Sequence, residues 1–545
     1  MRLVHYIKLT LIFQYGNIKL SIIVKERFIM KKILSVVMAI VMAFAIMVPA
    51  FAADKCNCGE TPSVYVAALG SGYVMLDEGT ENERVLFRPE TGDILKILLP
   101  VVPAAAELIA TKNYDKFGDV LIGCVNEAFG MLALDGNGDS HPRVTSEQFH
   151  PDTAEHGGDH SYYFGYDFRM DPVEHARDLH AYLEEVKELT GHDTVKIRAS
   201  SMGGVVMLAY IRLYGTKNIE TIIFQNCPLL GTAVAGELFN GKFEINKDAL
   251  VRYAECALPA IGVDFVSGLL YALCEALDEA GVFGALLGMV DGLIVNLKDR
   301  VFDECLIPIF GTLPGIWSFV PDEYYESGKE FMKLDPATQS GLIAKLDFYH
   351  YEVQSKAEEL LRGAQADGTN IYIVAGYNMQ RTPLVSAYME TSDGTVDTKY
   401  ASCGATCAPI GSQLPEDYKQ ARFNDIDYIS PDRMIDASTC MLPECTWFVK
   451  DMLHSTTHDG HGVFYDVLFA SEEQLTVFDM PEYPQFMQND TINQTFVPVA
   501  ELSSPIEDAF NMMKVIPSFL NFVKLVATVL ETVVDFVFKT IVPAA

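Results

Sequence analysis

Positive charge is scarce in this sequence. Its 545 residues include 40 Lys and Arg against 73 Asp and Glu, which gives a formal net charge of −33. Nucleic-acid binding depends on clustered Lys and Arg that neutralise phosphates. The composition therefore predicts no nucleic-acid partner, and it argues against a membrane surface of anionic lipids as an electrostatic partner.

Cysteine is also sparse, and biased segments are missing. The 11 cysteines are too few for a disulfide scaffold, with Cys403/Cys407 and Cys440/Cys445 as the closest downstream pairs and Cys56/Cys58 further upstream. No internal repeat or low-complexity linker is present. Because 50% of the residues are hydrophobic, the chain has enough apolar surface to fold, which excludes a disordered protein.

The first 53 residues have the pattern of a targeting segment. Lys31 and Lys32 precede 21 uncharged residues, 33–53, which contain Ala50-Phe51-Ala52 near their end. A basic start, an apolar core and an A-x-A site predict a secretory signal peptide. We expect translation to begin at Met30, residues 1–29 to be an over-called start, and the cleaved protein to be secreted; a retained membrane anchor is the alternative.

Strand and helix patterns alternate through the first half of the remaining chain. Short apolar strands are expected at 63–69, 194–199 and 219–224, and helices at 171–190 and 202–213. Asp171 can cap the first of these helices, with Pro172 in its first turn and Gly191 after its end. The alternation predicts an α/β fold with a mostly parallel central sheet and helices on both faces. Further strands are expected at 371–375 and 446–449.

Two apolar regions lack strand periodicity. Residues 235–345 are rich in Leu, Ala, Val and Phe, and we interpret them as a helical insertion that forms a lid rather than part of the sheet. The charge-free runs 265–274 and 280–290 are shorter than the ~18 residues that a membrane span needs. Residues 512–541 predict a helix that is hydrophobic nearly all round, which packs on its own domain or lies against lipid or a partner.

The segment Ala199-Ser200-Ser201-Met202-Gly203-Gly204 lies between a predicted strand and a predicted helix. A nucleophile on such a tight turn needs small residues two before and two after it, because the strand and helix would otherwise collide. Ala199 and Gly203 occupy those places around Ser201, although a glycine is more usual at the position of Ala199. The helix after Ser201 also directs free N–H groups at the reacting oxygen. Ser201 is therefore the candidate nucleophile, and an ordinary helix cap is the alternative.

Several segments of the chain resemble motifs of a known protein family. Tyr166-Asp167-Phe168-Arg169, Ser201-Met202-Gly203-Gly204, Pro228-Leu229-Leu230-Gly231-Thr232 and Ser392-Asp393-Gly394-Thr395-Val396 are similar to motifs of α/β-hydrolases of the lecithin:cholesterol acyltransferase-like and triacylglycerol-lipase-like group. Pro314-Gly315-Ile316-Trp317-Ser318 is similar to a further segment of that group. The matches occur in the family's order between residues 63 and 460.

The resemblance implies a triad in the order Ser, Asp, His. Asp393 follows a late strand in a glycine-containing turn and is the expected acid, with Asp397 as the near alternative. His454 is the first histidine after the last expected strand and is the expected base, with His458 and His461 as alternatives. The oxyanion hole is expected to use the backbone N–H groups of Met202 and of the Leu69/Gly70 turn.

No cofactor or metal is expected. The three histidines near Asp459 offer a metal cluster as a competing hypothesis. Asp135-Gly-Asn137-Gly-Asp139 has the oxygen spacing of a calcium loop, but it lacks a Glu at the twelfth position, so we interpret it as a solvated turn.

The expected function is that of a secreted serine hydrolase, a lipase or esterase that cleaves carboxylic esters through an acyl-enzyme. An acyltransferase, a peptidase or amidase, and a non-catalytic surface-binding protein remain alternatives. The expected partner is an ester or lipid, with transient lipid-surface contact through the lid or the C-terminal helix. The expected organisation is an over-called start at 1–29, a signal peptide at 30–52, core at 53–234, lid at 235–345, core at 346–470 and a C-terminal extension at 471–545.

Overall fold

A computed structural model describes residues 60–69, 72–87, 97, 99–151, 160–246, 249, 253, 290–422, 426–454, 462–490 and 493–499. One compact unit, Asn57–Ala545, contains all of these residues. The expected over-called start, the signal peptide and the C-terminal helix at 512–541 lie outside the described residues, as do Cys56 and Cys58.

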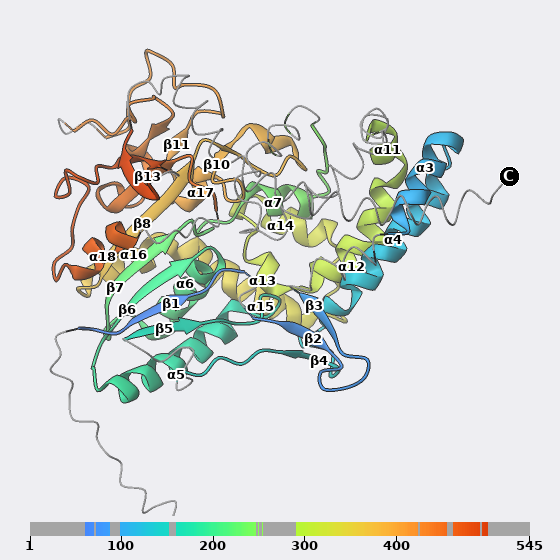
Figure 1. The fold of residues 1–545 in the computed structure, drawn as a ribbon, viewed down its shortest axis with the longest axis horizontal. Coiled ribbons are helices and arrows are strands. Elements are labelled where there is room, and N and C mark those ends of the chain that lie inside the picture. Colours follow the sequence, from blue (N-terminus) through green and yellow to red (C-terminus); the bar gives the residue numbers. More distant parts are fainter. Residues whose placement is uncertain are drawn as a thin grey trace, which may run out of the picture. The chain divides into compact units, whose positions relative to one another are not determined.

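An eight-stranded sheet forms the centre of the fold. Its order is β15-β14-β13-β8-β7-β6-β1-β5, and all neighbours pair in parallel except β14 and β15. Figure 1 shows β8, β7, β6, β1 and β5 side by side. The strands are β1 Ser63–Val66, β5 Ser161–Phe164, β6 Val195–Ser200, β7 Ile219–Gln225, β8 Asn370–Tyr377, β13 Thr446–Lys450, β14 Phe486–Asp490 and β15 Thr495–Pro498. The predicted α/β class with a mostly parallel sheet is confirmed.

Alternate residues of the central strands pack into different helical layers. Ile222 and Phe224 of β7 belong to a core shared with α5 Pro172–Thr190, α6 Met202–Tyr214 and α16 Ala357–Ala366. Ile223 between them packs with α18 Gly462–Ala470. Because successive side chains of a strand point to opposite faces, helices cover both faces of the sheet.

The expected strands and helices of the first half form with small shifts at their ends. Asp171 caps α5 by accepting the Val173 N–H at 2.9 Å, and Gly191 ends it with a φ of 69°. The first strand is shorter than expected, since β1 ends at Val66 and Leu69 already lies in a turn.

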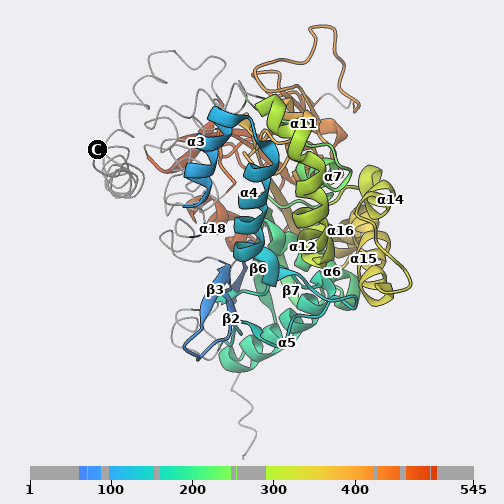
Figure 2. The ribbon, with the colours of Figure 1, turned by 90° about the vertical axis from the view of Figure 1, so that its right-hand side faces the viewer.

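The sequence did not predict a small antiparallel sheet and a helical hairpin between β1 and β5. The sheet has the order β3-β2-β4, with β2 Val74–Leu76, β3 Arg84–Phe87 and β4 Val144–Ser146. The hairpin is α3 Val101–Thr111 and α4 Tyr114–Phe129, which lies beside α11 Val290–Val301 from the insertion (Figure 2). Leu108, Phe117 and Leu297 form a separate apolar cluster among these three helices.

The described residues of the insertion form helices joined by turns and irregular segments, and none of them belongs to a strand. Its helices beyond α11 include α7 Ala233–Phe239, α12 Ile307–Ile309, α13 Pro314–Trp317, α14 Asp322–Phe331 and α15 Ser340–Glu352. Ala235, Trp317, Tyr325 and Leu346 belong to one buried cluster, so α7, α13, α14 and α15 pack as one body. The expected limits need two corrections: α15 runs past residue 345, and β14 and β15 extend the sheet beyond residue 470 because they pair next to β13.

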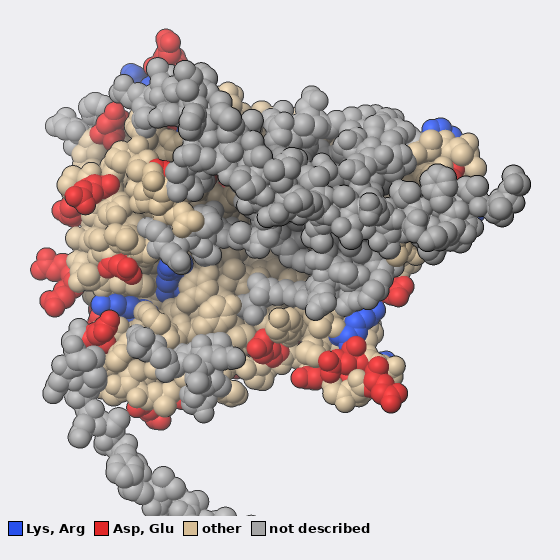
Figure 3. Space-filling model, viewed as in Figure 1, with Lys and Arg blue, Asp and Glu red and all other residues tan. Residues whose placement is uncertain are grey.

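Acidic side chains are spread over the face in Figure 3, where basic side chains are few. Within the described residues, no helix combines the length and the apolar character needed to cross a bilayer.

The cap of α5 provides a test of stability against pH. Burial raises the pKa of Asp171 to about 6. The folded protein therefore holds a proton on this group between about pH 4 and pH 6 that the unfolded chain releases, so this contribution to stability falls as pH rises through that window. Asp171→Asn keeps a good capping side chain without the charge. We expect it to raise the free energy of unfolding at pH 7 by roughly 1–3 kcal/mol.

Thermal unfolding of the wild type and of Asp171→Asn from pH 4 to pH 8 measures this effect. The advantage of the variant should shrink as the pH falls toward 4, where the folded wild type carries the proton and the unfolded chain begins to take it up. A constant difference at every pH would contradict the assignment.

Candidate active site

Ser201 lies on a tight turn between β6 and α6. Its backbone has φ 51° and ψ −123°, a conformation that residues other than glycine rarely adopt. A Cβ at Gly203 would lie 2.3 Å from the Val66 carbonyl oxygen, and one at Gly204 would lie 2.5 Å from Cys227 Cβ. The predicted turn is confirmed. Other segments of the protein approach α6 so closely that they leave no space for a side chain at Gly203 or Gly204.

The structure brings Ser201, His454 and Asp393 into one hydrogen-bonded chain. His454 Nε2 lies 2.7 Å from Ser201 Oγ, and His454 Nδ1 lies 2.7 Å from Asp393 Oδ2. Ser201 is 6% exposed and Asp393 1%, whereas the His454 side chain is 14% exposed. A proton on Nδ1 shared with the carboxylate leaves the lone pair of Nε2 directed at Ser201, where it can accept the serine proton.

Backbone N–H groups fix the carboxylate of Asp393. Its Oδ1 accepts the N–H groups of Thr395 at 2.9 Å and Val396 at 2.7 Å. These bonds leave Oδ2 directed at His454. Gly394 has a φ of 96°, which allows the chain to fold back so closely after Asp393.

His454 is also held through its own backbone. Its N–H donates to the Asp393 carbonyl at 2.8 Å, and its carbonyl lies 3.4 Å from Asn226 Nδ2. Asn226 is fully buried at the end of β7, and its Oδ1 accepts the Gly376 N–H at 2.9 Å. The role of Asn226 was not predicted from the sequence. Its only signal was a polar residue after a buried strand, which is common.

The expected oxyanion donors lie at the ends of adjacent elements. Met202 is the first residue of α6, where backbone N–H groups lack acceptors within the helix. Leu69 lies in the turn after β1, the strand next to β6. Tyr166 Oη donates to the Ala67 carbonyl at 2.7 Å, which fixes the chain two residues before Leu69. The donor role of Met202 and Leu69 remains a prediction.

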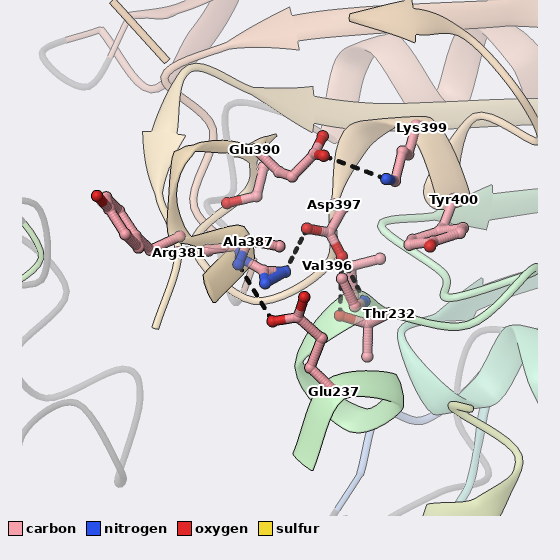
Figure 4. Close-up of polar contacts among 12 residues, drawn as sticks. Thr232, Glu237, Arg381, Ala387, Glu390, Val396, Asp397, Lys399 and Tyr400 are labelled. Atoms are coloured by element: carbon pink, nitrogen blue, oxygen red, sulfur yellow. Dashed lines mark hydrogen bonds and ion pairs between the residues drawn. The ribbon is translucent and has the colours of Figure 1, made fainter. Parts of the chain in front are cut away.

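The alternative acid does not join this chain of hydrogen bonds. Asp397 is fully buried and forms an ion pair with Arg381, as Figure 4 shows. Of the two residues, Asp393 is thus the one that bonds His454. The alternative bases, His458 and His461, lie outside the described residues.

Segments that resemble family motifs pack against the nucleophile turn. Asp167 and Arg169 form a buried ion pair with a distance of 2.6 Å between Oδ2 and Nη2. Gly315 lies so close that an added Cβ would be 1.9 Å from the Phe168 carbonyl oxygen and 2.8 Å from Met202 Cε. The segment around Gly315 therefore packs directly against both Met202 and Phe168.

Residues 135–139, the expected solvated turn, are held by hydrogen bonds between the Asp135 side chain and the backbone of the same turn. Asp135 Oδ1 accepts the N–H groups of Asn137 at 2.8 Å and Asp139 at 3.0 Å, and Lys345 Nζ lies 3.3 Å from Asp139 Oδ1. Backbone N–H groups, first that of Asp139, lower the pKa of Asp135. No cluster of three His, Cys, Asp or Glu side chains in the described part of the chain has a geometry that would hold a metal ion. Cys403, Cys407, Cys440 and Cys445 are unbridged.

Comparison with known proteins assigns no family. No protein-family model matches the chain, and no curated protein is significantly similar to it.

The close approach at Gly203 gives a direct test of this geometry. Gly203→Ala would force a methyl group against two carbonyl oxygens of the β1 segment, 2.3 and 2.9 Å away. Because backbone must move to relieve the overlap, we expect a loss of about 1–3 kcal/mol in the free energy of unfolding. Labelling of Ser201 by a serine-directed probe should slow as well.

Gly363→Ala is the matched control, because Gly363 lies inside α16 and an added Cβ there would have nothing within 4 Å. It should be neutral or stabilising by up to about 1 kcal/mol. Equal behaviour of the two variants in denaturant unfolding would show that the turn tolerates a side chain at 203.

Proposed function

We propose that this protein is a serine hydrolase of the α/β-hydrolase fold that cleaves carboxylic esters. The observation that carries the proposal is the pair of 2.7 Å contacts from Ser201 Oγ to His454 Nε2 and from His454 Nδ1 to Asp393 Oδ2. The positive φ of Ser201 adds support, because it lifts the hydroxyl out of the turn, as in the nucleophile turn of such enzymes.

The positions of the three residues in the sheet support the same fold. The nucleophile follows β6, the acid lies beyond β8, and the base follows β13. This chain order of Ser, Asp and His is the order found in α/β-hydrolases. The family resemblance of the four motifs agrees with it.

The proposed reaction begins with attack of Ser201 Oγ on the ester carbonyl carbon. His454 Nε2 takes the serine proton, while Asp393 holds the imidazole and stabilises its charged form. The Met202 and Leu69 N–H groups would stabilise the oxyanion of the tetrahedral intermediate. His454 then donates its proton to the leaving alcohol, and water activated by His454 releases the acid from the acyl-enzyme.

An apolar acyl group is the substrate class that the surroundings favour. The carboxyl ends of β1 and β7 flank Ser201, and the segments that follow them carry the half-buried Leu69 and Leu230. Ile316 and Phe319 from the insertion pack on the same core. The proposal therefore includes a lipid-like ester and brief contact with a lipid surface, and it keeps the expectation that the protein is secreted.

Labelling with a fluorophosphonate probe tests the nucleophile. Ser201→Ala should abolish labelling, because the probe forms its bond with the serine oxygen that His454 activates. The thermal midpoint should change by only a few degrees, since one hydroxyl group is removed. Ser200→Ala is the control and should label like the wild type. Labelling that persists in Ser201→Ala would refute the assignment, and a wild-type protein that never labels would favour the non-catalytic binding protein.

His454→Ala should lower turnover of p-nitrophenyl esters on the order of 10³-fold or more, because the serine would lose its general base. His458→Ala and His461→Ala should stay within several-fold of the wild type. The assay, run over a series of acyl chain lengths, also measures the preference for an apolar acyl group. A larger loss in either of the control variants would move the base to that histidine.

A further inference from the structure

The carboxylate of Asp397 is enclosed by donors from two other segments. Its Oδ1 bonds Arg381 Nη1, while Oδ2 accepts the Ala233 N–H at 2.7 Å and the Thr232 hydroxyl at 3.1 Å. Ala233 is the first residue of α7, so Asp397 caps that helix from a distant part of the chain. Figure 4 shows Arg381 and Thr232 directed at opposite oxygens of Asp397.

Arg381 depends on this carboxylate. Both side chains of the pair are fully buried. In the described part of the chain, Nε and Nη2 of Arg381 have no hydrogen-bond partner, which leaves Nη1 as the bonded nitrogen. Burial raises the pKa of Asp397, and Arg381 with the Ala233 N–H opposes that rise. Removal of either charge would thus strand the other one in the interior.

The pair closes a loop around the triad acid. Asp393 and Val396 exchange hydrogen bonds, with Asp393 N–H to the Val396 carbonyl at 3.2 Å and Val396 N–H to Asp393 Oδ1 at 2.7 Å. Asp393 also forms a backbone bridge to Met379, two residues before Arg381. The Asp393 backbone is therefore held between two segments, and the Arg381–Asp397 contact ties those segments together.

A second contact ties α7 to the same region. Glu237 on α7 is buried and accepts the Ser386 hydroxyl at 2.7 Å and the Ala387 N–H at 3.1 Å. The first helix of the insertion, α7, is thus bound to residues 386–397 through both its first residue and Glu237. It therefore supports the loop that carries Asp393.

We propose that Arg381 and Asp397 are positioning residues of the triad: their buried ion pair fixes the loop of Asp393 against α7 and so sets the Asp393–His454 hydrogen bond. The proposal rests on the proposed function, in which that bond orients the base. A displacement of about 1 Å at such a site can lower turnover by about 10²-fold.

Asp397→Asn and the double variant Arg381→Met/Asp397→Asn test this role. The single change leaves a buried guanidinium without its counter-charge, whereas the double change removes both charges and should restore the thermal midpoint. In both variants we expect kcat on p-nitrophenyl esters to fall by about 10- to 100-fold with KM within about twofold. The far-downfield proton NMR signal of His454 Nδ1–H, identified by its loss in His454→Ala, should weaken in both.

Glu390→Gln is the matched control. It makes the same carboxylate-to-amide change in the same segment, but Glu390 pairs with Lys399 at 3.3 Å on the surface, where both side chains are about a third exposed. Exposed ion pairs contribute little to stability, so kcat should stay within about twofold of the wild type. If the other two variants do not fold, Thr232→Val takes their place: it removes one donor to Asp397 and no charge, and kcat should fall about threefold.

The outcomes separate this role from a purely structural one. A double variant that regains both its midpoint and its kcat would overturn the proposal, and so would an unchanged kcat in a folded single variant or in Thr232→Val. If the wild type turns over no ester, the proposed function fails instead. The NMR signal of His454 Nδ1–H then tests the positioning role of Arg381 and Asp397 by itself. Loss of this signal in the folded double variant supports the role, and its persistence refutes it.

Discussion

The strand-to-helix turn at Ser201 is the constraint on which the site depends. The end of β1 and the segment that follows β7 press against the start of α6, with Val66 O beside Gly203 and Cys227 beside Gly204. A positive φ at a serine costs about 1–3 kcal/mol and persists only when the surroundings enforce it. Here residues 202–211 of α6 are all buried, so packing of the helix on the sheet sustains the strain.

The parallel sheet then brings distant segments to that turn. Ser201 and His454 are 253 residues apart, and Asp393 and His454 are 61 apart. Because carboxyl ends of parallel strands meet at one edge, β6, β7, β8 and β13 deliver the four segments of the site together. Backbone bonds between segments complete the arrangement, since His454 is bonded at both N–H and carbonyl. The alignment of the triad is therefore a property of the main chain as well as of three side chains.

Local patterns predicted those parts of the fold that local physics determines. The cap, the proline and the closing glycine of α5 lie within one stretch of sequence, and so do the residues around Ser201. The helices α3 and α4 escaped prediction because Leu108 and Phe117 pack with Leu297 of α11, far later in the chain, in a cluster separate from the core of the sheet. The roles of Asn226 and Arg381 were equally hidden, since each depends on partners that only the folded sheet brings close. His454 was predicted only as the first of three histidines, because the spacing could not show which one reaches Asp393.

The buried ion pair of Arg381 and Asp397 lies in a part of the chain, between β8 and β13, that has little regular secondary structure. Between β8 and β13 the described chain has only two-residue strands, such as β10 Thr391–Ser392, and short helical turns. Apolar packing is non-directional, so it would stabilise such a segment without fixing the direction of one carboxylate. Ion pairs and capping bonds are directional, and a buried pair that loses one member is strongly penalised. Asp397 therefore contributes what extended secondary structure provides elsewhere in the sheet: a single arrangement of the backbone, in which Asp393 Oδ2 faces His454.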